Sequence, residues 1–202
     1  SDTTGYAQVE ADEVETLTIA SNANAAGDVS TNGVEVLTVQ AATGLVFNGA
    51  ADFAASSLVN TTLLTSINAS AMTGDLTLTG IDASVLTLTD GPGDLTVTIA
   101  GLNNADSIDG GDQDTATGDT VTASAVTGLT AATGALDVSN VETLNIQATG
   151  ANTFDLSNVD NVGVFAISGA TPGTQTLTNV AAGQVLSLGD AADEFDNGAE
   201  LD

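Results

Sequence analysis

Apolar and polar residues alternate along the segment between residues 74 and 101, GDLTLTGIDASVLTLTDGPGDLTVTIAG. Leucine, valine or isoleucine takes every second position in three short runs, and threonine takes the positions between. Because successive side chains of a β-strand point to opposite faces, this alternation predicts half-buried strands with an outer face of threonine. The runs recur about every ten residues. The tetrad GDLT at 74–77 also returns at 93–96, nineteen positions later.

The rest of the chain reads as looser copies of this unit. The phrase V-E-x-L-x-(I/V) occurs at 14–19, 34–39 and 141–146 and predicts a strand at each place. Turn residues such as Gly, Asn, Asp and Ser separate the predicted strands. Only the alanine-rich segment 41–57 has a composition in which a short helix is expected.

This spacing predicts an all-β fold. Units of about 20 residues with two strands each are typical of a parallel β-solenoid, whereas strands about ten residues apart also suit an antiparallel β-sandwich. The repeated phrases favour the solenoid, in which we expect equivalent positions to stack from turn to turn. We expect one elongated domain over 1–202, with the alternative of two lobes, 1–103 and 120–202, joined by an acidic loop at 104–119.

Charge sets the chain apart from an ordinary β-domain. It has 27 acidic residues and no Lys, Arg or His, which gives a formal net charge of -27. No side chain can therefore pair with a carboxylate, and repulsion destabilises the compact state unless bound cations or salt neutralise it. Such a chain is not expected to bind nucleic acid or an anionic membrane surface, because both interactions need basic residues. No apolar run reaches the ~18 residues of a membrane-spanning segment.

The segment ADSIDGGDQDTATGDT, residues 105–120, has the densest acidic cluster. Calcium prefers carboxylate and carbonyl oxygens in flexible geometry, and glycine permits the turns that direct carbonyls inward. Zinc and copper prefer His or Cys, which the chain lacks. The alternative is a solvated acidic loop. We predict a calcium site with the ligands Asp106, Asp109, Asp112, Asp114 and Asp119.

Two family resemblances follow from these residues. Gly110-Gly111, with Asp112 and Asp114, is similar to the calcium-binding repeats of RTX proteins secreted through type I systems, although Gln113 replaces a glycine of that repeat. The segment SNVETLNIQATGANTFDLSNVDNV, with ADSIDGGDQD, resembles bacterial surface-layer proteins of the Caulobacter type. That resemblance implies secretion, a location at the cell surface, and calcium-dependent assembly into a lattice.

Other functions receive less support. Without His, Cys or Lys, and with few aromatic residues, an enzyme is not expected, and a paired-carboxylate glycosidase is only a formal possibility. The Thr-x-Thr pairs resemble the ice-binding face of some antifreeze proteins, although threonine is also a common outward residue of strands. Asp75, Asp90 and Asp94 are expected to accept backbone hydrogen bonds in turns.

The sequence thus predicts a non-enzymatic, extracellular structural protein. Its identical subunits are expected to assemble, with calcium, into a surface lattice or filament, with cell-surface polysaccharide as a further candidate partner. A calcium-stiffened segment of a large adhesin is the first alternative, and an ice-binding protein is the second.

Overall fold

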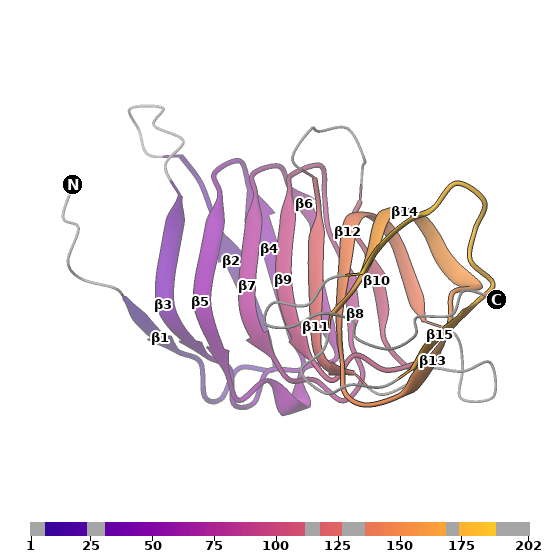
Figure 1. The fold of residues 1–202 in the computed structure, drawn as a ribbon. Helices are drawn as coiled ribbons and strands as arrows, with labels where there is room; N and C mark the ends of the chain where they lie inside the picture. Colours follow the sequence, from indigo (N-terminus) through magenta and orange to yellow (C-terminus); the bar gives the residue numbers. More distant parts are fainter. Residues whose placement is uncertain (1–6, 24–30, 112–117, 127–135, 169–173, 189–202) are drawn as a thin grey trace.

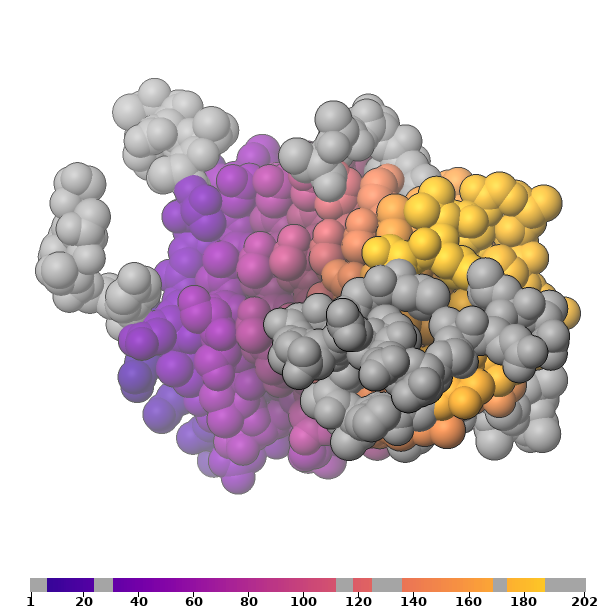
Figure 2. Space-filling model, viewed as in Figure 1, coloured from indigo at the N-terminus to yellow at the C-terminus, as the bar shows by residue number. Residues whose placement is uncertain are grey.

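The computed structural model describes residues 7–23, 31–111, 118–126, 136–168 and 174–188. Within these residues the fold is all-β, and the strands stack in parallel as a β-solenoid of about six turns. Figure 1 shows the N-terminal strands at one end of the stack and β13 and β15 at the other. In the space-filling view the turns follow one another in sequence order along the molecule (Figure 2).

The elements are short. They are β1 (Gln8–Glu10), β2 (Thr16–Ala20), β3 (Asn32–Thr38), β4 (Gly44–Gly49), β5 (Phe53–Val59), the 3-10 turn η1 (Thr61–Leu63), β6 (Ser66–Met72), β7 (Leu76–Ile81), β8 (Thr87–Thr89), β9 (Leu95–Ala100), β10 (Ser107–Asp109), β11 (Thr120–Val126), β12 (Asp137–Ala148), β13 (Asn152–Asp155), β14 (Asn158–Ser168), β15 (Gln175–Thr178) and β16 (Val185–Leu188).

From β1 to β11 the odd- and even-numbered strands form the two walls of the solenoid, and β13 and β15 pair in a separate two-stranded sheet. One wall runs β1-β3-β5-β7-β9-β11, and the other runs β2-β4-β6-β8-β10. The long strand β12 joins the walls, because its residues 137–139 pair with β10 and its later residues pair with β11. β14 then pairs with β12 along both parts. All described strand pairs are parallel, so the solenoid prediction is confirmed and the antiparallel sandwich is excluded.

The GDLT repeat lies in register, as expected. Leu76 pairs with Leu95 and Thr77 with Thr96, so the nineteen-residue repeat is one full turn of the solenoid. The V-E phrases behave differently. The copy at 14–19 overlaps β2 and the copy at 34–39 overlaps β3, which lie on opposite walls. Their similarity therefore does not mark stacked positions.

The helix expected in 41–57 is wrong. This segment forms β4 and β5, and its alternate apolar residues point into the solenoid, where Leu45, Phe47 and Ala55 are fully buried. Phe47 also packs against Phe53, with ring centroids 5.3 Å apart. Burial of such side chains stabilises the fold by about 1.5–3 kcal/mol each, which outweighs the weak helix preference of alanine.

Inward-facing aliphatic side chains fill the solenoid from turn to turn. Leu76 and Leu78 on β7 continue into Leu95 and Val97 on β9, and all four are buried. The interior therefore consists of apolar columns parallel to the solenoid axis. A polar residue at an inward position interrupts such a column and must find its partners inside the protein. No helix in the described part of the chain is long and apolar enough to cross a membrane.

Candidate functional site

Two aspartates occupy inward positions of these columns. Asp90 directly follows β8, where the alternation of buried Leu86 and Leu88 places the next inward side chain at residue 90. Asp119 directly precedes β11 and occupies the position that Leu95 has in the preceding turn, because Thr120 pairs with Thr96. Their exposed fractions are 5% and 3%. We call these two residues the acidic corner.

Asp119 is partly satisfied by the backbone. Its Oδ1 atom accepts a hydrogen bond from the Leu95 N–H at 2.7 Å. Its own N–H donates to the carboxylate of Glu142 in the next turn. The pKa of Asp119 is nevertheless raised to about 7, chiefly by burial, with the negative charges of Glu142, Asp94 and Asp109 as smaller causes that act against the hydrogen bond from Leu95.

Asp90 has fewer partners. Its backbone N–H donates to the carbonyl of Asp109 at 2.9 Å, which holds the residue against the next turn. Its Oδ2 atom is buried and has no hydrogen-bond partner. The pKa of Asp90 is raised to about 7, chiefly by burial and against a hydrogen bond from Gly91, and the charge that adds most to the rise is that of Asp119. The two carboxylates therefore oppose each other's ionisation.

The exposed aspartates at the strand starts have another role. The Asp52 Oδ1 atom accepts the Asp75 N–H, and the Asp75 Oδ1 atom accepts the Asp94 N–H, both at 3.0 Å. Each carboxylate thereby ties one turn to the next. The expectation that Asp75 accepts a backbone hydrogen bond is confirmed. Asp90 accepts a backbone hydrogen bond, from Gly91, on one carboxylate oxygen only. The prediction of a turn aspartate did not include the inward position of its side chain.

The predicted calcium ligands are not gathered into one group by the described residues. Asp106 is buried, and its two oxygens accept the N–H groups of Leu86 and Asn103 at 2.7 and 2.8 Å. Burial raises its pKa. Asp109 accepts the Gly111 N–H and the Asn140 side-chain amide. Asp112 and Asp114 lie outside the described residues, so their role stays a prediction.

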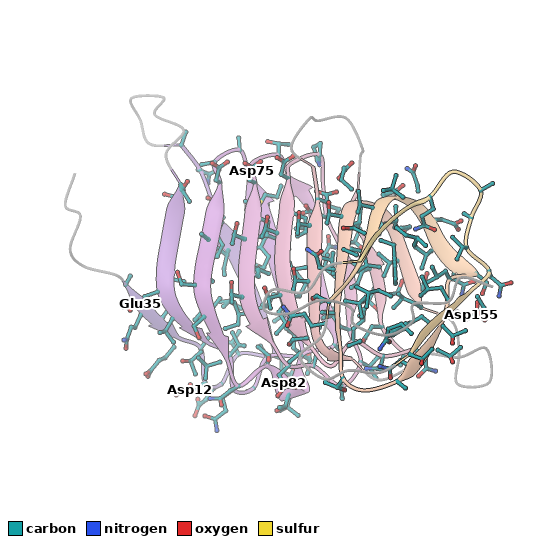
Figure 3. All side chains as sticks on the ribbon, viewed as in Figure 1. Asp12, Glu35, Asp75, Asp82 and Asp155 are labelled. Carbon is teal, nitrogen blue, oxygen red and sulfur yellow. The ribbon has the colours of Figure 1, made fainter. Side chains whose placement is uncertain are left out.

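Other acidic side chains lie at separate places around the molecule. Figure 3 labels five of them, Asp12, Glu35, Asp75, Asp82 and Asp155, of which Asp155 is buried. Across the described ranges, no set of three or more acidic side chains comes close enough to hold a metal by itself. Any cation bound there needs backbone carbonyls or water as well.

Comparison of the chain with protein-family models, with curated proteins and with solved structures found no match. The functional argument therefore depends on the geometry of the solenoid and on its charge.

Proposed function

We propose that this chain is a non-enzymatic structural subunit of the cell exterior, which assembles end to end into a filament or lattice with the help of calcium. This proposal rests on the strand pairing at the two ends of the solenoid. β1 and β2 end the two walls in the described chain, and β15 and β16 each pair with one described strand only. An open parallel edge is a template for another strand, and a second copy can supply it.

Apolar residues at both ends support this proposal. At the N-terminal end, Leu17 and Ile19 on β2 are only partly covered, and Val9 on β1 is exposed. At the opposite end, Leu186 is partly covered and Val185 is 55% exposed. Leu186 continues the inward column of Phe165, whereas Val185 continues the outer position of Val164. Stacking one solenoid on another would therefore extend the interior through Leu186 and cover the edge at Val185.

The negative charge of the chain explains why assembly is proposed to depend on calcium. Every charged side chain is acidic, so two copies repel each other at every separation within the screening length. Divalent cations bound to carboxylates reduce this repulsion and can bridge two copies. The resemblance to surface-layer and RTX proteins agrees with such a mechanism.

The test is sedimentation velocity during a calcium titration, followed by chelation. Val185→Asp places a charge on the terminal strand, where charges oppose strand addition. Val85→Asp is the matched control, because Val85 is 42% exposed and lies between β7 and β8, away from both ends. Calcium-dependent, reversible assembly of the wild type and the control, but not of Val185→Asp, supports the proposal. A wild-type chain that stays a folded monomer in calcium contradicts it and favours the adhesin segment.

The threonine columns favour ice binding as a second candidate. Thr77, Thr96 and Thr120 stack in register, and so do Thr79, Thr98 and Thr122. They lie on the outward side of β7, β9 and β11, adjacent in Figure 1. Parallel strands place these hydroxyl and methyl groups about 4.8 Å apart across strands, in a rigid array that can order water.

Thermal hysteresis tests this second candidate. We expect Thr96→Lys to abolish it, because the lysine interrupts the array. The matched control is Thr87→Lys, an exposed threonine on β8 of the other wall. Absence of hysteresis in the wild type, or equal loss in both variants, excludes this face as an ice-binding surface.

A further inference from the structure

The acidic corner has a geometry that the fold alone does not require. Asp90 and Gly110 occupy equivalent positions in neighbouring turns, because Thr89 pairs with Asp109. Gly110 has no side chain, and the Asp119 Oδ2 atom lies within 2.5 Å of the point where a Cβ atom would be. The Asp119 carboxylate thus takes the place of a side chain at Gly110 and is stacked next to Asp90.

A backbone oxygen approaches the same point. The Asn140 carbonyl oxygen lies even closer than Asp119 Oδ2 to the missing Cβ position of Gly110. Two oxygens bound to one calcium ion, each at about 2.3–2.6 Å, are up to about 5 Å apart. Asp119 Oδ2 and the Asn140 carbonyl meet this condition, since both lie within 2.5 Å of a single point.

The buried Oδ2 atom of Asp90 is the independent observation that points to a ligand. A buried carboxylate oxygen without a partner is costly, and a second carboxylate beside it increases the cost. The chain has no basic side chain that could neutralise the pair. In the folded protein, either a bound proton or a bound cation must therefore neutralise the pair.

We propose that Asp90 and Asp119 bind one calcium ion within the solenoid, with the Asn140 carbonyl as a further ligand. Water completes the oxygen ligands of the ion. The site joins successive turns, because Asp90 follows β8, Asn140 lies on β12 two strands along the same wall, and Asp119 precedes β11. Calcium therefore stabilises the single molecule. The proposal rests on the proposed function only for the identity of the cation, and its binding is measured separately from assembly.

The experiment compares Asp90→Asn with Asp82→Asn. Both changes remove one negative charge and keep the size of the side chain, but Asp82 is exposed at a turn (Figure 3). Calcium binding is measured by isothermal titration at pH 8, and the Tm is measured with calcium and with chelator. We expect calcium to raise the Tm of the wild type and of Asp82→Asn. We expect Asp90→Asn to weaken binding at least tenfold and to lose most of the rise in Tm.

Asp119→Asn is the second variant, in case Asp90→Asn does not fold, and the same loss is expected. Equal binding by Asp82→Asn and the folded acidic-corner variant overturns the site. Absence of calcium binding by the wild type at pH 8 also overturns it, and leaves the proton as the neutralising species. Sedimentation of the same samples separates the two proposals. Calcium binding by the wild type without assembly contradicts the proposed function only. Calcium-dependent assembly of the wild type, with equal calcium binding by Asp90→Asn and Asp82→Asn, contradicts the site only.

Discussion

Two buried aspartates of this solenoid lie in opposite electrostatic situations. Asp155, at the end of β13, is 3% exposed, and its Oδ1 atom accepts hydrogen bonds from the Asn179 amide at 2.8 Å and the Ser157 N–H at 3.0 Å. The Asn179 hydrogen bond lowers the pKa of Asp155. Asp90 is equally covered, but one oxygen has no partner and its pKa is raised.

The difference shows that burial alone does not decide the charge of a carboxylate. Asp155 lies at the C-terminal end of the solenoid (Figure 3), and there the hydrogen bonds from Asn179 and Ser157 affect its pKa more than desolvation does. Asp90 lies in the middle of the stack, where desolvation prevails and the neighbouring charge is negative. The Asp155 carboxylate is stable in its ionised form, whereas the carboxylates of the acidic corner need a bound proton or cation.

The largest effect is expected from filling the space at Gly110. Gly110→Ala places a methyl group against the Asn140 backbone and the Asp119 carboxylate. We expect a loss of about 3 kcal/mol in the free energy of unfolding, because backbone must move to relieve the overlap. Gly150→Ala, near the Asp155 end, is the comparison. A Cβ atom added at Gly150 meets no atom within 4 Å, but the backbone has a φ of +73° that disfavours alanine. A loss of about 1 kcal/mol in the free energy of unfolding is therefore expected. Urea denaturation measures both, and equal losses contradict this interpretation.

Asn179→Asp should make the surroundings of Asp155 resemble those of Asp90 in the acidic corner. The change replaces an amide donor to Asp155 by a second carboxyl group, and Asp tolerates the left-handed backbone of this position (φ 58°). We expect the Tm to fall by several degrees at pH 8 and to recover as the pH is lowered, since protonation removes the repulsion. Asn179→Ala controls for loss of the hydrogen bond, and its fall in Tm should not recover at low pH. A pH-independent fall in Asn179→Asp excludes the repulsion.

The acidic corner also predicts how stability depends on pH. Asp90 and Asp119 have folded pKa values near 7, above the ordinary value of 3.8, so the folded state binds more protons than the unfolded state between about pH 4 and 7. Their contribution is full below pH 4 and is lost as the pH rises through about 7. In chelator, the Tm of Asp90→Asn should therefore fall less between pH 5 and 8 than that of Asp82→Asn. Parallel curves contradict this assignment.

The smallest effect on the free energy of unfolding is expected at Asp75, an exposed aspartate whose carboxylate ties one turn to the next. Asp75→Asn keeps an oxygen that can accept the Asp94 N–H, so the free energy of unfolding should change by less than about 0.5 kcal/mol. Asp75→Ala removes this acceptor and should cost about 1 kcal/mol. Urea denaturation at pH 8 distinguishes the two variants. A large loss in Asp75→Asn shows that the charge itself is required at this exposed position.

Much of the fold could be predicted from the sequence, because alternation and turn spacing are local. The GDLT repeat gave a correct turn length for β7 and β9. The V-E phrases misled because turn lengths vary, and Thr16 on β2 pairs with Gly44, twenty-eight residues later. The helix at 41–57 failed because alanine also fits the small interior of a stacked fold.

The acidic corner was less accessible to sequence reasoning. The sequence predicts Asp119 as a ligand because it belongs to a Gly- and Asp-rich segment, not because it faces inward. The sequence contains a signal for Asp90, since Leu86, Leu88 and Asp90 follow the period of two. Its nearness to Asp119 has no local signal, because it depends on the register of β8 with β10 and on the missing side chain of Gly110.

The most direct test of the acidic corner is a ¹³C NMR titration of the aspartate carboxyl groups, with and without calcium. In chelator, Asp90 and Asp119 should titrate as a coupled pair near pH 7, while Asp155 titrates below its ordinary value. Calcium should move the titration of the pair well below pH 7 and leave that of Asp155 unchanged. Ordinary titration of Asp90 and Asp119 near pH 4 in chelator, with no response to calcium, would contradict the account.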